Sequence, residues 1–129
     1  MPLYRCTYPE GALDPSQRAA LAVAFTDIHC ELTGAPRTFV HVQFHPRPVP
    51  ADGPPYQLHA GIRAGRDRTL ADELVSRCIA AVSATTGAAP SAVTMRTSST
   101  PASWILEGGR VLPEPGEEDD WVAGAGDPT

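Results

Sequence analysis

The chain has 129 residues, of which 42% are hydrophobic and 19% are charged, which fits one domain with a hydrophobic core and excludes two. All ten basic residues are arginine, so a lysine Schiff base and a P-loop lysine are both excluded. The formal net charge is -5: residues 107–129 hold seven acids and one arginine, whereas residues 1–106 hold eight acids and nine arginines, and this nearly balanced charge argues against a nucleic-acid binder.

The first half of the chain predicts a strand, a helix and a second strand. Residues 3–8 combine aromatic and other β-favouring residues, which is typical of a short strand. Asp14 is the expected helix N-cap, with Pro15 at the first helical position and Gln17 at the third. Apolar residues then recur at helical spacing, namely Leu21, Phe25, Ile28 and Leu32. Residues 38–45 are expected to form the second strand.

The second half repeats this order of elements. Residues 57–62 are a candidate strand, and residues 91–97 are another. Between them, Thr69 is expected to cap a second helix, with Asp72 three residues later in a variant of the capping box. The apolar stripe of this helix consists of Leu70, Leu74, Cys78 and Ala81 or Val82.

A short sequence match indicates that the two halves arose by duplication. Thr33-Gly34-Ala35 recurs 53 residues later as Thr86-Gly87-Ala88, and each glycine is expected to end its helix. We therefore predict two β-α-β pseudo-repeats, at about residues 2–48 and 56–100.

Two such units predict a two-layer α+β fold, in which a four-stranded sheet carries both helices on one face. The other face would be bare, which favours oligomerisation through it. A short helix at 100–106, a turn at Gly108-Gly109 and a strand at 110–112 predict a C-terminal hairpin. The domain is expected to span residues 2–121, followed by a flexible acidic tail at 122–129.

Pro2 is the first candidate for acid–base chemistry. Removal of the initiator methionine, which is usual before a small residue such as proline, would expose a secondary amine. Burial at the start of a strand would lower the pKa of that amine, because the charged form loses hydration. Such an amine would serve as a general acid or base near neutral pH. The alternative is an ordinary Met-Pro chain start with Met1 retained.

Arg63 and Arg66 lie between the end of a predicted strand and the start of a predicted helix. The planar guanidinium group pairs bidentately with a carboxylate, so these arginines are a candidate grip for an acidic substrate. The alternative is two surface arginines paired with Asp67 or Asp72. The acidic run at residues 117–120 is interpreted as a solvated edge.

The chain contains Pro2, then Thr-Asp-Ile-His-Cys-Glu-Leu-Thr-Gly at 26–34, Arg-Ala-Gly-Arg at 63–66, and Glu-Gly-Gly-Arg-Val-Leu-Pro-Glu-Pro-Gly at 107–116. Together these segments resemble the tautomerase superfamily, and within it the cis-3-chloroacrylic acid dehalogenase group. The resemblance extends from Pro2 to about Trp121. It implies a homotrimer of tautomerase-like domains that uses no cofactor.

The resemblance also implies a role for each matching residue. Pro2 matches the catalytic N-terminal proline, and Glu107 matches a glutamate that helps to activate water. Arg63 and Arg66 match the pair that grips the substrate carboxylate, and His29 matches a histidine that helps to bind it. In the dehalogenases, water adds to C3 of a cis-3-haloacrylate, the proline delivers a proton to C2, and halide leaves.

Arg96 departs from the pattern of the family. The dehalogenases place a tyrosine near the end of the last core strand, where it works with the glutamate, and the alignment puts Arg96 at that position. A guanidinium is a permanent cation and not a phenol. Arg96 could pair with Glu107 and keep it ionised, act as a third anchor for the substrate carboxylate, or impair water activation.

Tautomerisation needs fewer groups than hydration, because one acid–base group and cations that stabilise an enolate suffice. Pro2, Arg63 and Arg66 would supply them, so we rank first a tautomerase acting on a small 2-oxo or enol carboxylic acid. A hydratase or dehalogenase acting on cis-3-haloacrylates or related unsaturated acids ranks second. A malonate semialdehyde decarboxylase-like enzyme and a non-catalytic carboxylate-binding trimer are the remaining alternatives.

No other class of partner is indicated beyond a small carboxylate substrate. The apolar runs are shorter than the roughly 20 residues that a membrane span needs. Three widely spaced cysteines fit reduced thiols in a cytoplasmic protein. His41, His45 and His59 lack the tight ligand spacing of a zinc site, so neither a metal nor another cofactor is predicted.

Overall fold

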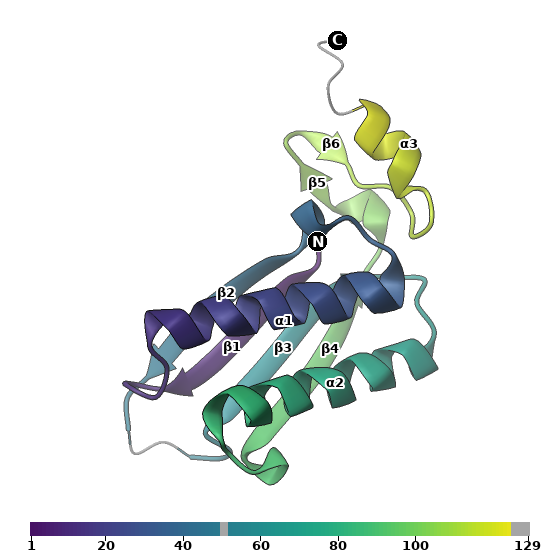
Figure 1. Cartoon of the computed structure of the whole chain (residues 1–129). Helices are drawn as coiled ribbons and strands as arrows, with labels where there is room; N and C mark the ends of the chain where they lie inside the picture. The colour runs from purple at the N-terminus through teal and green to yellow at the C-terminus, as the bar shows by residue number, and fades with distance from the viewer. Residues whose placement is uncertain (50–51, 125–129) are drawn as a thin grey trace.

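The computed structural model describes residues 1–49 and 52–124, and Figure 1 shows their arrangement. The first half contains β1, α1 and β2, at Leu3–Pro9, Pro15–Thr33 and His41–Arg47. The second half contains β3, α2 and β4, at Tyr56–Arg63, Arg68–Thr86 and Val93–Thr100. Short 3-10 helices, η1 and η2, precede β2 and β4 at Arg37–Phe39 and Pro90–Ala92. The C-terminal segment contains η3, β5, β6 and α3, at Ala102–Trp104, Leu106–Glu107, Arg110–Val111 and Glu118–Ala123.

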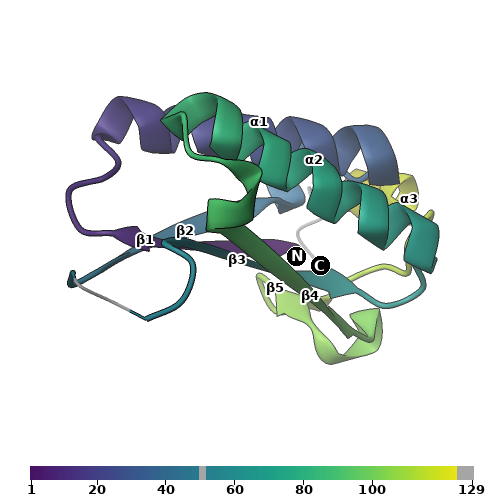
Figure 2. The same ribbon diagram turned by 90° about the horizontal axis from the view of Figure 1, so that it is seen from below.

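The four long strands form one mixed sheet in the order β2-β1-β3-β4. β1 is parallel to β2 and β3 is parallel to β4, so each half contributes one parallel pair. The halves meet at the antiparallel pair of β1 and β3, where Cys6 lies opposite Leu58 and Leu3 lies opposite Gly61. Both long helices cover the same face of the sheet (Figure 2). The predicted fold class is confirmed, including the C-terminal hairpin of β5 and β6.

The helices of the two halves occupy matching positions along the chain. α1 and α2 begin 53 residues apart, at Pro15 and Arg68, and both end at a left-handed glycine, Gly34 (φ 74°) or Gly87 (φ 76°). Glycine adopts positive φ without a steric penalty, which explains why the same tripeptide recurs at both helix ends.

The predicted limits of the domain and of the pseudo-repeats stay predictions. At the C-terminal end, α3 continues to Ala123 and therefore includes the first two residues of the predicted tail. Residues 125–129 of that tail lie outside the described residues.

The two helices begin with different caps. In α1, Asp14 Oδ1 accepts from the Gln17 N–H at 2.7 Å and Gln17 Oε1 accepts from the Asp14 N–H at 3.0 Å, which completes the predicted capping box. The predicted Thr69 cap of α2 is wrong. Asp67 is the N-cap, and its carboxylate accepts from the Leu70 N–H at 2.8 Å. Because Asp67 satisfies this otherwise unpaired N–H, the helix begins two residues earlier than predicted.

The strand predicted at 38–45 begins later, at His41, because η1 precedes it. The Val40 N–H donates to the Arg37 carbonyl at 3.2 Å, and Phe39 is buried. Similarly, β4 begins only after η2 and reaches Thr100. The predicted helix at 100–106 is reduced to the single turn of η3.

The hydrophobic core lies between the helices and the sheet. Side chains alternate along β1, so Tyr4, Cys6 and Tyr8 point towards the helices, where they join a core cluster that includes Phe25 and Leu74. None of the described helices combines the length and the apolar character that a bilayer span requires.

The helix-free face of the sheet is polar rather than apolar. It contains a shallow hollow of about 600 Å³, whose lining includes Arg5, His59 and Arg96. The large exposed apolar side chains of the C-terminal segment lie elsewhere, on or beside the hairpin, at Trp104, Leu106, Val111 and Val122. An oligomer contact that buries apolar surface would therefore use the hairpin more than the centre of the sheet.

Replacing Asp67 by alanine is expected to lower the free energy of unfolding by about 1 kcal/mol, because the first turn of α2 loses its side-chain acceptor. Thr69→Ala is the matched control and should change that free energy by less than about 0.5 kcal/mol. Urea denaturation followed by circular dichroism measures both values. A larger loss in the Thr69→Ala protein would mean that Thr69 is the cap after all.

Candidate active site

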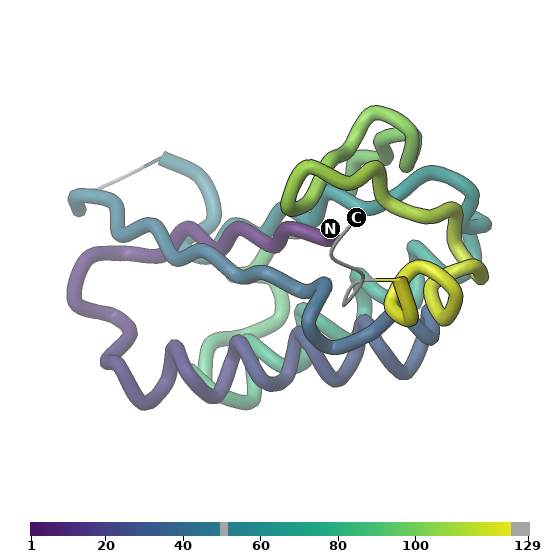
Figure 3. The backbone as a smooth tube through the Cα atoms, turned by 90° about the horizontal axis from the view of Figure 1, so that it is seen from above, coloured from purple at the N-terminus to yellow at the C-terminus, as the bar shows by residue number. Residues whose placement is uncertain are grey.

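The pairing of β1 with β3 brings several predicted site residues to one end of the sheet. Leu3 lies opposite Gly61, two residues before Arg63, so Pro2 and Arg63 come close together. The hairpin lies at the same end, and Figures 1 and 3 show the N-terminus beside β5 and β6. The second half of α1 reaches this end too, and there His29 feels the charges of Arg63, Arg66 and the chain start.

The chain start is buried beside a carboxylate. Pro2 is fully buried, and its carbonyl accepts from the His41 N–H at 3.0 Å, which ties the start of β1 to β2. The amine of Met1 lies 3.5 Å from Glu107 Oε2. Burial lowers the pKa of this amine, while Glu107 partly opposes the effect by stabilising the ammonium form. An amine at this place is therefore poised to give up its proton more readily than a solvated one.

A tight hairpin turn positions Glu107. Gly108 and Gly109 join β5 to β6 with φ angles of 61° and 81°, and Glu107 lies opposite Arg110. Two successive positive φ angles are typical of a two-residue hairpin turn, for which glycine is well suited. The Glu107 side chain is 35% exposed, so water can reach a carboxylate that also faces the Met1 amine.

Arg63 is buried and held by three groups. Its Nη1 donates to the Pro113 carbonyl at 2.7 Å, and its Nη2 donates to Glu118 Oε1 at 2.7 Å. The guanidinium also lies over the Phe39 ring, 5.4 Å from the ring centroid. The alternative of a surface arginine paired with Asp67 or Asp72 is therefore wrong for Arg63.

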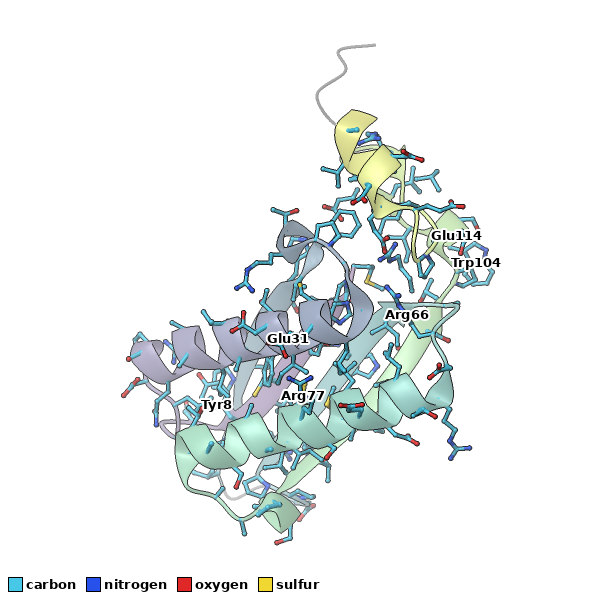
Figure 4. All side chains as sticks on the ribbon, turned by 45° about the vertical axis from the view of Figure 1, so that its right-hand side comes forward. Tyr8, Glu31, Arg66, Arg77, Trp104 and Glu114 are labelled. Carbon is cyan, nitrogen blue, oxygen red and sulfur yellow. The ribbon has the colours of Figure 1, made fainter. Side chains whose placement is uncertain are left out.

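Arg66 is held more loosely than Arg63. Its Nη1 donates to the Thr33 carbonyl at 3.4 Å, and its Nη2 is 3.7 Å from Glu118 Oε1. Figure 4 shows Arg66 between the ends of the long helices and the C-terminal segment. Burial lowers the pKa of Arg66, and the neighbouring charge of Arg63 lowers it further. Arg66 nevertheless remains a cation at neutral pH, because its guanidinium starts from so high a pKa.

Glu118 binds to both arginines, so the interpretation of residues 117–120 as a solvated edge is wrong at this position. The residue is 6% exposed, and its Oε2 accepts from the Gly116 N–H at 2.9 Å. Burial alone would raise the pKa of Glu118, but the hydrogen bond from Arg63 and its charge outweigh that effect and hold the pKa below its usual value. Glu118 is therefore an anion inside the predicted carboxylate grip.

His29 is a buried, neutral imidazole. Its Nδ1 lies 2.8 Å from the Tyr4 hydroxyl. Burial lowers the pKa of His29 to about 3, and the charges of Arg66 and Arg63 act in the same direction. Burial also raises the pKa of Tyr4, so the phenol keeps its proton. The Tyr4 hydroxyl fixes one ring nitrogen and leaves Nε2 free for another partner.

Arg96 lies apart from these residues within one chain. It is exposed on β4, opposite His59, and lines the hollow on the helix-free face. Among the described residues, no hydrogen bond or ion pair joins Arg96 to Glu107, which pairs instead with the Met1 amine. The roles predicted for Arg96 stay predictions.

The histidines on the helix-free face contact other polar groups. His59 Nε2 is 3.0 Å from Ser98 Oγ, and His45 Nε2 is 3.2 Å from Gln43 Oε1. Within residues 1–49 and 52–124, no three His, Cys, Asp or Glu side chains converge as a metal site requires.

Sequence reasoning missed Tyr4 and Glu118. The alternation of β1 could have directed Tyr4 towards the helix that carries His29. Glu118 has acidic neighbours at 117, 119 and 120, and no spacing signal separates it from them. Its burial depends on the path of the chain after Pro113, which is a tertiary feature.

Comparisons with known proteins identify the class of protein. Residues 1–52 match the family model described as "Putative oxalocrotonate tautomerase enzyme". The crystal structure of N1, a member of the cis-3-chloroacrylic acid dehalogenase (cis-CaaD) family, is 29% identical with a TM-score of 0.88, over 94% of this chain and 90% of N1. Native Ps01740 is 33% identical with a TM-score of 0.77, over 81% of this chain and 99% of that one.

Native fused 4-OT shares the fold, with a TM-score of 0.76 at 19% identity over 84% of this chain and 94% of that one. No curated protein matches the chain. The chain belongs to the tautomerase superfamily, as its motifs predicted, and is similar to the cis-3-chloroacrylic acid dehalogenase group.

His29 is expected to stay neutral when the folded protein is titrated from pH 8 to about pH 4, because its pKa is about 3. NMR titration of the imidazole measures this, with His29→Gln used to assign the signal. The unfolded chain takes up a proton on His29 near pH 6.5, whereas the folded chain does not. The contribution of His29 to the free energy of unfolding therefore falls as the pH drops from about 6.5 towards 3. A His29 midpoint near pH 6.5 in the folded protein would contradict this account.

Proposed function

We propose that the protein is a tautomerase-type enzyme that acts on a small 2-oxo or enol carboxylic acid. After removal of Met1, the secondary amine of Pro2 would be the acid–base group. The observation that carries the proposal is the position of the chain start. Pro2 is buried, and the Met1 amine next to it lies 3.5 Å from Glu107 and close enough to Arg63 for that charge to lower the pKa of the Met1 amine. Membership in a superfamily of enzymes supports it as well.

The proposed reaction moves one proton from oxygen to carbon. The neutral amine of Pro2 removes the proton of the enol hydroxyl, the C–O bond becomes C=O, and the resulting ammonium delivers a proton to the adjacent carbon. Arg66 holds the substrate carboxylate, and the charge of Arg63 behind it helps to stabilise the enolate between the two steps. Neutral His29 would offer an N–H to the same carboxylate without adding charge.

Hydration or dehalogenation of an unsaturated acid is the second proposal. The partly exposed carboxylate of Glu107 can contact both water and the amine, which is the arrangement that water activation needs. In that reaction, the water oxygen bonds to C3 while Glu107 takes one water proton and the ammonium form of Pro2 protonates C2. The C3 hydroxyl then loses its proton and becomes C=O as the halide departs from C3. Arg96 in place of the tyrosine of the dehalogenases is the feature that ranks this activity below tautomerisation.

A malonate semialdehyde decarboxylase-like enzyme and a non-catalytic carboxylate binder remain further alternatives with the same grip. We also propose a homotrimer, because two fused 4-OT proteins of this fold were solved as trimers, one asymmetric and one symmetric. The exposed apolar side chains of the hairpin offer a surface for such a contact. The three cysteines are free, which fits a cytoplasmic location.

Pro2→Ala is expected to lower kcat/KM for the ketonisation of phenylenolpyruvate by about 10- to 100-fold, because a more flexible primary amine replaces the buried secondary one. Ultraviolet absorbance follows the reaction, and intact mass must first show that Met1 is absent. Pro55→Ala is the matched control, since Pro55 is an exposed proline that precedes β3 as Pro2 precedes β1. Equal rates for Pro2→Ala and wild type, or full activity with Met1 retained, would rule out the proline mechanism.

Arg96→Tyr is expected to raise chloride release from cis-3-chloroacrylate by about tenfold over a weak wild-type rate, because a phenol brought to the active site by the proposed homotrimer can give up and take back a proton, whereas a guanidinium cannot. Ion chromatography of released chloride measures the rate. Arg96→Met, which removes the charge without adding a phenol, separates the two effects. Strong release by the wild-type protein would show that Arg96 does not limit dehalogenation.

A further inference from the structure

The carboxylate of Glu118 occupies the place where two arginines converge. Its Oε1 lies 2.7 Å from Arg63 Nη2 and 3.7 Å from Arg66 Nη2, and the side chain is 8% exposed. The other oxygen, Oε2, accepts the backbone N–H of Gly116 at 2.9 Å. Both oxygens are therefore bound, and the carboxylate is part of the site rather than a passing surface contact.

The segment that carries Glu118 is attached on both sides of it. Before Glu118, Leu112 is buried and the Pro113 carbonyl accepts from Arg63. After it, the Trp121 ring packs edge-on against Phe39 at 5.3 Å between centroids, and Arg110 donates to the Trp121 carbonyl at 2.9 Å. Phe39 is the ring on which the Arg63 guanidinium lies. These contacts fix the Glu118 charge beside the arginines.

The two arginines consequently differ in their remaining capacity to bind a substrate carboxylate. Arg63 is 3% exposed and already donates to two short acceptors. Arg66 has only long contacts, of 3.4 and 3.7 Å, and its side chain is 12% exposed. An incoming carboxylate can pair with Arg66 at little loss, whereas pairing with Arg63 would have to displace Glu118 or Pro113.

The charges around the site give the consequence for specificity. Arg63 and Arg66 contribute two positive charges, Glu118 and Glu107 contribute two negative charges, and His29 is neutral. One substrate carboxylate finds Arg66. A second carboxylate on the same molecule finds Arg63 already paired with Glu118, and the Glu107 carboxylate beside the chain start would repel it.

We propose that Glu118 is a specificity-determining residue, a built-in counter-ion that reserves the arginine pair for one substrate carboxylate and so selects monocarboxylates against dicarboxylates. This inference rests on the proposed carboxylate-binding function of Arg63 and Arg66. It does not depend on the acid–base chemistry of Pro2, so equilibrium binding can test it separately from turnover.

The test compares propionate with malonate, which have the same number of carbon atoms but one and two carboxylates. Isothermal titration calorimetry on the full chain gives both dissociation constants. In Glu118→Gln, which keeps the shape of the side chain and removes its charge, malonate affinity is expected to rise about tenfold relative to propionate affinity. Glu117→Gln is the matched control, because it removes an equal charge from an exposed neighbouring residue, and it should leave the ratio unchanged.

The double variant Arg63→Gln/Glu118→Gln serves if the single variant folds poorly, since it removes both members of the buried pair and restores the wild-type local charge. Its ratio of malonate to propionate affinity is expected to return to the wild-type value. An equal gain for both ligands in Glu118→Gln would overturn the proposal, because Glu118 would then be a movable competitor for any carboxylate. A loss for both ligands would also overturn it, because Glu118 would only support Arg63.

Failure of this inference can be told apart from failure of the proposed function. If Glu118→Gln leaves the affinity ratio unchanged while Pro2→Ala abolishes ketonisation, only the role of Glu118 is wrong. If neither the wild type nor Glu118→Gln binds propionate or malonate, the arginine pair is not a carboxylate grip, and both proposals are overturned.

Discussion

The antiparallel pairing of β1 with β3 is the constraint on which the candidate site depends. Within each half the two strands are parallel, so the start of one strand lies beside the start of the other. Because β1 and β3 pair in antiparallel fashion, the start of β1 lies instead beside the end of β3. A chain start and a buried arginine therefore meet without a long loop, and the hairpin with α3 covers the place where they meet.

Burying Arg63 would be costly without partners, and the C-terminal segment supplies them. A buried ion pair contributes little net stability, but removing one partner leaves an uncompensated charge at a cost of about 3–5 kcal/mol. In the described part of the chain, no buried side-chain nitrogen or oxygen lacks a hydrogen-bond partner. Because several hairpin side chains are exposed and apolar, the polar contacts of Arg63 with Pro113 and Glu118 help to set the path of the chain after β4.

The fold could be predicted from local signals because those signals agree with one another. The Asp14 capping box, the apolar stripe of α1 and the two helix-ending glycines fixed both β-α-β halves. Errors arose where two residues compete for one role, as Asp67 and Thr69 do, or where a 3-10 turn interrupts an apolar run. The partner of Arg63 could not be predicted, because four acidic residues in a row look alike until tertiary contacts select Glu118.

The repeat also has an inexact internal symmetry, which explains why one end of the sheet carries the polar cluster. The 53-residue offset relates Pro2 to Pro55, His29 to Val82 and Arg63 to Glu10. Val82 is buried at the helical position that His29 occupies in the other half, and Glu10 is exposed. The nitrogen of Pro55 belongs to a tertiary amide, which carries no proton and has no basicity. The two halves thus share a scaffold but not a terminus, so that each chain can hold a single N-terminal amine, and the end of the sheet where Pro55 lies has no equivalent of it.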